Sequence, residues 1–220
     1  MAAEPEVNIR TVCILGHSYI RRLKEFINAS DLRTNLNLDM DSFKVDFRSR
    51  GGLTFKRLAH CAEFLRFDAP PDICFIQMGS NDLSLNNPQK VCTDLISYAQ
   101  YLRDGVGIKT VIVGQLLRRQ PWASRDKFNE DVVKVNNLLK EETGKVDGVY
   151  FWPHRGFWAD LSYLGRDGVH IEGRSYLNGE RHQQPKGIPR QQRLATQSPG
   201  KDKKQFPCKK LTIRNWRKKF

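Results

Sequence analysis

Four short blocks of the sequence carry residue types that support nucleophilic catalysis, and the first block contains a serine. Ser18 lies in Gly16-His17-Ser18-Tyr19, between an apolar run and an amphipathic segment. A serine on a tight turn from a strand into a helix has its hydroxyl at the carboxyl edge of the sheet. The helix N-terminus favours negative charge that develops there. Ser18 is therefore a candidate nucleophile. The alternative is that its hydroxyl only caps the helix.

A candidate base lies far along the chain, in Asp167-Gly168-Val169-His170. A carboxylate three residues before a histidine can reach the imidazole across one turn and orient it. Held in this way, His170 can take a proton from a serine hydroxyl as general base and then return it as general acid. The alternative is a surface Asp-Gly turn beside an unrelated histidine.

Two more blocks offer hydrogen-bond donors for a negatively charged oxygen. In Gly51-Gly52-Leu53-Thr54, two glycines before a helix can adopt positive φ and present a bare backbone N–H. In Gly79-Ser80-Asn81-Asp82, Asn81 offers an amide donor, which stabilises an oxyanion without titrating. Each block alone also fits an ordinary loop, with Thr54 as a helix cap or with residues 79–82 as a turn. Together, the four blocks supply a nucleophile, oxyanion donors and an oriented base.

The segments between these blocks alternate between short apolar runs and helical patterns. The run 11–15 is apolar without alternation, which is typical of a strand buried on both faces. The run 43–47 alternates apolar residues with Lys and Asp, as at a sheet edge. We expect strands at 11–15, 43–47, 72–78, 110–113 and 146–152, and helices at 19–28, 54–67, 88–103 and 127–142. The stripe of the helix over 54–67 is formed by Phe55, Leu58, Ala59, Ala62 and Leu65.

Strand–helix alternation of this kind predicts a parallel sheet with helices on both faces. Sites in such sheets form at the carboxyl ends of the strands, where all four blocks are expected. With the blocks in this order, the sequence resembles the SGNH-hydrolase (GDSL-like esterase/lipase) superfamily over roughly residues 10–175. It is most similar to the animal and retroelement-derived variants that have Gly-His-Ser in place of Gly-Asp-Ser. The resemblance implies an α/β fold of three layers, α/β/α and flavodoxin-like, with a five-stranded parallel sheet in the order 2-1-3-4-5. The corresponding domain spans residues 8–178.

The resemblance also implies a role for each block. Ser18 is the nucleophile, His170 the base and Asp167 its orienting carboxylate. The oxyanion hole is formed by the Ser18 N–H, the Gly52 N–H and the Asn81 side chain. The implied reaction is hydrolysis of a small-molecule carboxylic ester through an acyl-enzyme, without a metal or cofactor. Contacts with the substrate are expected from Gly51, His17 and His154, the last of which follows the fifth strand.

Two departures from the family pattern keep a second function open. His17 replaces the usual aspartate, which helps to fix the nucleophile loop. The segment from Ile171 to Glu180 is short for the helix that normally follows the histidine block. The alternative function is therefore a catalytically inactive SGNH-like domain that binds a ligand in the same pocket.

The net charge of +13 is concentrated in one segment. Residues 181–220 hold 13 Lys and Arg residues and a single acid, Asp202, so this segment carries +12 and the rest of the chain carries +1. Its Gln, Pro, Gly and Lys content predicts a disordered basic tail. Such a tail can bind nucleic acid non-specifically through phosphates, and the alternative is a solvated tail without a partner.

Composition also excludes several classes of protein. No run reaches the 18 apolar residues of a membrane span, and the start MAAEPEVNIR lacks the apolar region of a secretory signal. The five cysteines are odd in number and show no C-x-x-C spacing, which indicates reduced thiols and no metal site. We expect a cytoplasmic protein, with the nucleus as a second location because of the basic tail.

Overall fold

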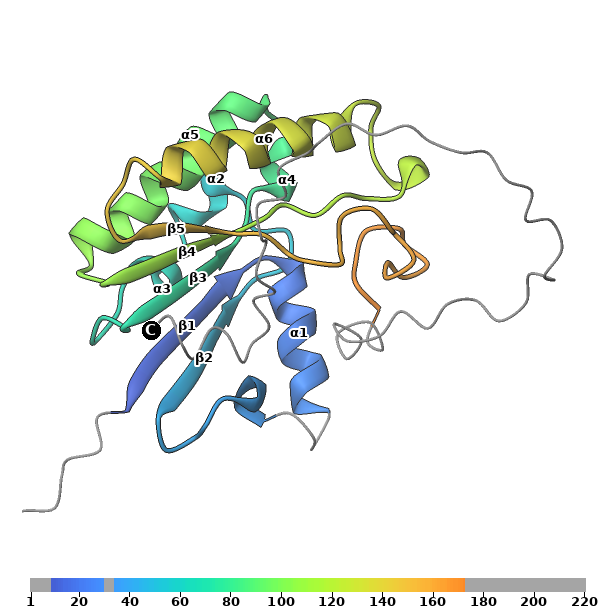
Figure 1. Cartoon of the computed structure of the whole chain (residues 1–220). Helices are drawn as coiled ribbons and strands as arrows, with labels where there is room; N and C mark the ends of the chain where they lie inside the picture. Colours follow the sequence, from blue (N-terminus) through green and yellow to red (C-terminus); the bar gives the residue numbers. More distant parts are fainter. Residues whose placement is uncertain (1–8, 30–33, 173–220) are drawn as a thin grey trace, which may run out of the picture. The chain divides into compact units, whose positions relative to one another are not determined.

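A five-stranded parallel sheet with helices on both faces forms the centre of the protein (Figure 1). The computed structural model describes residues 9–29 and 34–172. The predicted strand order is confirmed, since the strands lie in the order β2-β1-β3-β4-β5. The strands are β1 (Arg10–Gly16), β2 (Phe43–Ser49), β3 (Ile73–Gln77), β4 (Thr110–Gly114) and β5 (Val149–Trp152). The end of the predicted domain, residues 173–178, and the basic tail, 181–220, lie outside the described residues.

Short helices and turns connect the strands. The helices are α1 (Ser18–Asn28), α2 (Phe55–Leu58), α3 (Ala62–Leu65), α4 (Ser80–Leu83), α5 (Pro88–Gln100) and α6 (Phe128–Thr143). Two 3-10 helices lie in the connections, η1 (Thr34–Asn37) before β2 and η3 (Pro121–Ala123) after β4. The π-helix η2 (Tyr101–Gly105) follows α5 directly. Pro88 begins α5, as predicted, because a helix leaves its first N–H groups unpaired and loses nothing to a proline there.

The strand β1, which lies inside the sheet between β2 and β3, has the burial that its composition predicts. All residues from Val12 to Gly16 are buried, and the strand pairs with β2 on one side and β3 on the other. In the edge strand β2, Phe43, Val45 and Phe47 are less exposed than the Lys44 and Asp46 between them. This alternation follows from the geometry of a strand, in which successive side chains point to opposite faces.

The two faces of the sheet carry different helices. α1 packs against β1 and β2 on one face, whereas α2, α4, α5 and α6 lie on the other (Figure 1). The larger core lies on the second face, where Leu15 and Val113 of the sheet meet Leu95 of α5 and Val135 of α6, all with no exposed surface. Burial of each such side chain stabilises the fold by about 1.5–3 kcal/mol. This layer fixes β1 and β4, which lead into the loops described below.

The segment 54–67 differs from its prediction. It forms two short helices, α2 and α3, and not one long helix. The buried residues are Leu58, Cys61 and Phe64, whereas Ala59 and Ala62 of the predicted stripe are exposed. A spacing of three residues suits a tighter turn than the α-helix, and the backbone bonds from His60 to Arg57 and from Cys61 to Leu58 span three residues. The helix therefore breaks so that Cys61 and Phe64 can enter the core.

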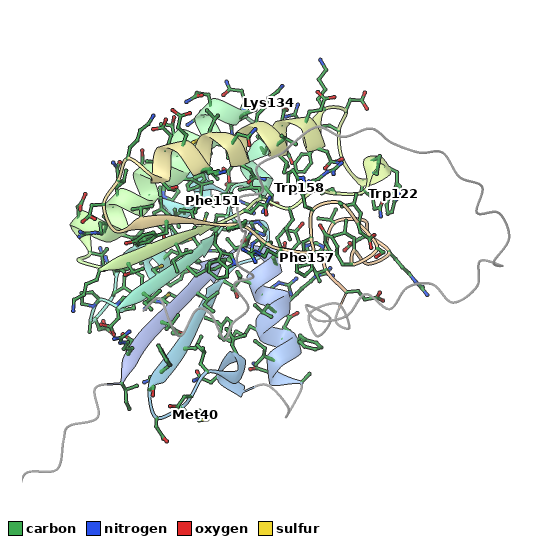
Figure 2. The ribbon with its side chains drawn as sticks, in the orientation of Figure 1. Met40, Trp122, Lys134, Phe151, Phe157 and Trp158 are labelled. Atoms are coloured by element: carbon green, nitrogen blue, oxygen red, sulfur yellow. The ribbon has the colours of Figure 1, made fainter. Side chains whose placement is uncertain are left out.

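The strand ends lead into the segments that contain the four blocks. Figure 2 shows Trp122 on the loop after β4 and Phe157 on the loop after β5, both on the carboxyl-end side of the sheet. The loop after β5 has an apolar cluster of its own, in which Tyr163, Leu164 and Ile171 pack with Tyr19 and Leu117. This cluster anchors the loop on α1. Within the described ranges, no helix is long and apolar enough to cross a membrane.

Candidate active site

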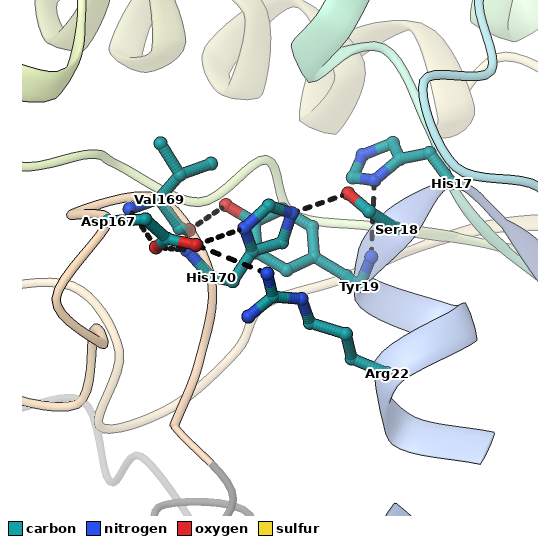
Figure 3. A network of polar contacts seen from close by, with 7 residues as sticks. All are labelled: His17, Ser18, Tyr19, Arg22, Asp167, Val169 and His170. Atoms are coloured by element: carbon teal, nitrogen blue, oxygen red, sulfur yellow. Dashed lines mark hydrogen bonds and ion pairs between the residues drawn. The ribbon is translucent and has the colours of Figure 1, made fainter. Parts of the chain in front are cut away.

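Ser18 is the first residue of α1, and its hydroxyl does not cap the helix. The cap is His17, whose Nδ1 accepts a hydrogen bond from the backbone N–H of Tyr19 at 3.4 Å. The turn that precedes α1 requires glycine at position 16, because a Cβ on Gly16 would lie 2.4 Å from the carbonyl oxygen of Gln77. Ser18 Oγ instead lies 2.8 Å from Nε2 of His170 (Figure 3). The helix-cap alternative is therefore wrong for Ser18.

His170 is held by Asp167, as the spacing of the block predicts. Its Nδ1 lies 2.7 Å from Oδ2 of Asp167. The other carboxylate oxygen accepts the backbone N–H groups of Val169 at 3.0 Å and His170 at 2.9 Å. The structure thus brings Asp167, His170 and Ser18 into one line of hydrogen bonds, although Ser18 and His170 are 152 residues apart.

The charge of Asp167 fixes the direction of these hydrogen bonds. Partial burial acts to raise the pKa of Asp167, but the backbone N–H groups of His170 and Val169 and the His170 ring outweigh it, so that the pKa is lowered. An ionised carboxylate only accepts hydrogen bonds, so Nδ1 of His170 carries the hydrogen. In the neutral ring, Nε2 is then the acceptor for the Ser18 hydroxyl. This is the arrangement that a general base requires.

The loop with Asp167 and His170 is tied to two other elements. The Tyr19 hydroxyl donates to the carbonyl oxygen of Val169 at 2.6 Å, and the backbone N–H of Gln120 donates to the carbonyl oxygen of Gly168 at 2.8 Å. Gly168 has a φ of +64°, and a Cβ there would lie 2.8 Å from Gln120, Trp122 and Ala123. The close approach therefore depends on glycine. Sequence reasoning missed both Tyr19 and Gln120.

The two predicted oxyanion blocks are bonded to each other. The Asn81 amide donates to the carbonyl oxygen of Leu53 at 3.1 Å, and Asp82 Oδ1 accepts the backbone N–H of Phe55 at 2.9 Å. Gly52 adopts a φ of +66°, which explains the glycine, and both Gly51 and Gly52 are exposed. Thr54 caps α2, as the loop interpretation of this block also predicted. The block after β3 thus sets the position of the Gly51–Thr54 loop.

His17, one of the expected substrate contacts, lies in the turn before α1. Its side chain is buried, and Nε2 lies 2.9 Å from the hydroxyl oxygen of Ser80. Burial lowers the pKa of His17 to about 3, and the positive charge of Arg119 and the His170 ring act in the same direction. Neutral His17 accepts at Nδ1, so Nε2 donates to Ser80. His17 therefore joins the nucleophile turn to the block that contains Asn81.

His154 belongs to a network at the ends of the central strands. Its Nε2 lies 2.8 Å from Oε1 of Gln77, and its backbone N–H donates to the Gln115 side chain at 2.8 Å. Burial lowers the pKa of His154 to about 4. The ring lies over Gly114, where a Cβ would be 3.2 Å from Nε2. These contacts link β3, β4 and the segment after β5, and they run to Gln77 and Gln115 rather than to Ser18 or His170.

Arg119, which the sequence analysis also missed, lies behind the nucleophile turn. Its guanidinium donates to the Ser80 carbonyl oxygen at 3.2 Å and to Ser84 Oγ at 3.3 Å, and it stacks on Phe128 at 4.3 Å. The backbone of Arg119 is held by the side-chain amide of Asn129 in α6. The amide oxygen accepts the Arg119 N–H, and the amide nitrogen donates to the Arg119 carbonyl oxygen. This arginine therefore connects the loop after β4 to the block with Asn81.

A hydroxyl within hydrogen-bond distance of an imidazole that a carboxylate orients is the geometry of nucleophilic catalysis. Ser18, His170 and Asp167 have this geometry. The loops after β2 and β3 offer N–H donors at the same edge of the sheet. Among the described residues, no group of three or more His, Cys, Asp or Glu side chains is placed to hold a metal ion.

Comparison with known proteins gives matches among solved structures. No family model and no curated protein matches the chain. A carbohydrate esterase of family 3 from Talaromyces cellulolyticus is 18% identical, with a TM-score of 0.54, over 76% of this chain and 90% of that one. A member of the lipolytic G-D-S-L family from Veillonella parvula is 17% identical, with a TM-score of 0.52, over 76% and 92%. The chain has the fold of the SGNH hydrolases.

A third similar structure is a catalytic mutant of an acetylxylan esterase from Geobacillus stearothermophilus. It is 12% identical, with a TM-score of 0.54, and the match covers 76% of this chain and 89% of that one. Identities this low establish the shared fold, and the role of each residue in this chain rests on its own geometry.

Proposed function

We propose that the protein is a serine esterase that hydrolyses carboxylic esters of small molecules through an acyl-enzyme on Ser18. The observation that carries this proposal is the continuous line of hydrogen bonds from Asp167 through His170 to Ser18, with distances of 2.7 and 2.8 Å. A base within hydrogen-bond distance of a hydroxyl, and itself oriented by a carboxylate, activates a nucleophile. The esterases that share the fold support an ester as the substrate.

The proposed reaction has two steps, acylation of Ser18 and hydrolysis of the acyl-enzyme. Ser18 Oγ attacks the ester carbonyl carbon while its proton moves to His170 Nε2. The tetrahedral oxyanion accepts hydrogen bonds from the Ser18 and Gly52 N–H groups and from the Asn81 amide, one of whose two hydrogens remains after the bond to Leu53. The carbon–oxygen bond to the alcohol then breaks, and His170 returns the proton to the leaving alkoxide.

Water completes the cycle. His170 takes a proton from a water molecule, whose oxygen attacks the acyl carbon, and Ser18 leaves with the proton from His170. The products are a carboxylic acid and an alcohol. Neither a metal ion nor an organic cofactor is needed in this scheme. Gly51 is exposed and lies next to Gly52, the proposed oxyanion donor, so we expect it to contact the substrate.

Labelling with a fluorophosphonate probe tests the proposal. We expect labelling of the wild-type protein, and a loss of at least about 100-fold in both Ser18→Ala and His170→Ala, since the members of such a triad act as a unit. Ser162→Ala is the matched control, because this exposed serine bonds Asp160 in the same loop as His170. The same variants should lose hydrolysis of 4-nitrophenyl acetate. A folded wild-type protein that is not labelled would favour the inactive binding domain instead.

The basic segment 181–220 supports a second candidate function. Its charge of +12 favours non-specific binding of nucleic acid, and the Gly-His-Ser block favours a relationship with retroelement-derived members of the superfamily. We expect the full chain to bind single-stranded DNA with an affinity that falls steeply with salt. A chain that ends at residue 180 should lose this binding and keep its labelling. Binding retained by the shorter chain would contradict the assignment to the tail. This candidate is consistent with a cytoplasmic or nuclear location.

A further inference from the structure

α1 supplies a second side chain to the site, one turn after the nucleophile. Ser18 and Arg22 are four residues apart on this helix, so they lie on the same face. The Arg22 guanidinium donates through Nη2 to Oδ2 of Asp167 at 3.2 Å (Figure 3). The same carboxylate oxygen accepts the hydrogen bond from His170. One helix therefore carries both the nucleophile and a cation on the carboxylate of its base.

The hydrogen bonds to Asp167 show what Arg22 adds. Oδ1 accepts the backbone N–H groups of Val169 and His170, and Oδ2 accepts the His170 ring and Arg22. Three of these four described donors belong to the loop itself. Arg22 is the one that comes from another element, so it ties the carboxylate, and not only the loop backbone, to α1.

Several charged or titratable groups face Asp167 and His170. From α1, Arg22 forms an ion pair with Asp167, and Tyr19 also interacts with that carboxylate. His17, in the turn before α1, lies near the His170 ring. Arg119, from the loop after β4, acts on Tyr19 and His17. Arg22, Arg166, Asp167 and Glu172 line a cavity of about 440 Å³ on the side of the loop that faces α1. Within the described part of the chain, Arg22 forms an ion pair with Asp167, and His170 forms a second one when its ring is protonated.

We propose that Arg22 is a positioning residue of this site, which holds Asp167, and through it His170, in line with Ser18. The proposal rests on the esterase function proposed above. Its electrostatic consequence has a definite sign. A cation beside Asp167 weakens the attraction of the carboxylate for a protonated His170. Removal of that cation should therefore favour the protonated ring, so that the base becomes available only at higher pH.

Three variants separate this role from a general effect of charge. Arg22→Gln removes the cation and keeps a hydrogen-bond donor, and Arg22→Lys keeps the cation. Lys24→Gln is the matched control, because Lys24 is an exposed cation on the same helix and makes no described hydrogen bond or ion pair. The readouts are the rate of fluorophosphonate labelling from pH 5 to pH 9 and the titration of the His170 ring protons by NMR. The ring signal is identified among the five histidines by its absence in His170→Asn.

In Arg22→Gln, we expect the acid limb of labelling and the titration midpoint of the ring to move up together by about 0.2 to 0.7 pH unit. This size is that of a solvent-screened ion pair, since the two side chains are 39% and 42% exposed. The plateau should fall by about 3- to 10-fold as the alignment loosens. Arg22→Lys should keep the wild-type midpoints, and Lys24→Gln should match the wild type in both readouts.

Three results would overturn the proposal. The first is that the two midpoints in Arg22→Gln equal those of the wild type. The second is that the midpoints in Lys24→Gln move as far as those in Arg22→Gln. The third is that the plateau of labelling in Arg22→Gln falls with no shift of midpoint, which indicates a merely structural role. The NMR titration needs no activity. If the wild type is not labelled but the ring midpoint moves as expected, the esterase proposal fails and the positioning of His170 by Arg22 stands.

Discussion

The hydroxyl of Tyr19 lies 2.6 Å from the carbonyl oxygen of Val169, so the residue after Ser18 is bonded to the residue before His170. The Tyr19 ring also meets the His170 ring edge to face, with centroids 5.6 Å apart. The two parts of the candidate site are therefore bonded directly to each other, and we expect this hydrogen bond to affect the rate of the proposed acyl transfer.

Tyr19→Phe removes this hydrogen bond and keeps the ring. We expect the free energy of unfolding to fall by about 1 kcal/mol and the rate of fluorophosphonate labelling to fall by about 3- to 10-fold. Tyr101→Phe is the control, because the Tyr101 hydroxyl donates to the carbonyl oxygen of Leu65 at 2.8 Å, away from the site. That variant should label like the wild type. An equal loss of labelling in both variants would show that the Tyr19 bond has no special role.

Gly168→Ala tests the close packing behind the base. The added Cβ meets a backbone with positive φ and three side-chain atoms at 2.8 Å. We expect a loss of more than about 2 kcal/mol in unfolding experiments, since strain and overpacking both contribute. Labelling of Ser18 should fall sharply as His170 moves.

Gly156→Ala is the matched control for the effect of φ alone. Gly156 has a φ of +86°, but a Cβ there would meet nothing within 4 Å. We expect a loss of about 1 kcal/mol and an unchanged labelling rate. If Gly168→Ala and Gly156→Ala lost the same stability and the same labelling, the crowding of Gly168 by Gln120, Trp122 and Ala123 would have no effect on either property.

The fold was predictable from sequence because each strand is a short run whose burial matches its composition. β1 is apolar from Val12 to Leu15 and lies inside the sheet, whereas β2 alternates and is an edge strand. The segment 54–67 was not predicted correctly. Its apolar residues fit a helical stripe, and only the core itself selects Cys61 and Phe64 for burial over Ala59 and Ala62.

The first and last blocks predicted the contacts of Ser18, His170 and Asp167. Parallel strands bring their carboxyl ends to one edge, which explains how distant blocks can meet. The supporting residues were not predictable in the same way. Tyr19 reaches Val169 across 150 positions of sequence, and Arg22 reaches Asp167 across 145. Such contacts depend on how the loop after β5 packs on α1. A tyrosine or an arginine on an amphipathic helix carries no local signal of that packing.

Asp82 should make the fold less stable as the pH rises. Burial raises the pKa of Asp82 to about 6, although Oδ1 accepts the Phe55 N–H, and Oδ2 is buried without a described partner. The folded state holds the proton more tightly than the unfolded chain, whose carboxyl titrates near 3.9. The stability from the protonated carboxyl is therefore present at low pH and lost between about pH 4 and pH 6.

Asp82→Asn removes this titration and keeps the acceptor for Phe55. From urea denaturation at pH 4.5 and pH 7.0, we expect the variant to gain about 2 kcal/mol relative to the wild type on going to the higher pH. Asp126→Asn, which changes an exposed carboxyl, should show no such gain. Equal pH dependence in Asp82→Asn and wild type would mean that Asp82 is ionised in the folded protein at little cost.

His17 should have the opposite effect on stability. Its folded pKa of about 3 lies below that of an exposed imidazole, near 6.5, because burial disfavours the charged ring. The unfolded chain therefore binds a proton that the folded state excludes, and stability falls as the pH drops below about 6.5. Between pH 7.5 and pH 5.0 this amounts to about 2 kcal/mol.

His17→Asn should remove that acid sensitivity, since asparagine is a good helix cap and does not titrate. The measurement is the free energy of unfolding at pH 7.5 and pH 5.0, and the wild type should lose about 2 kcal/mol more than the variant between these values. His60→Asn, a change at an exposed histidine, should keep the wild-type difference. If His17→Asn kept it as well, the folded protein would accept a proton at His17, and its donation to Ser80 through a neutral ring would be wrong.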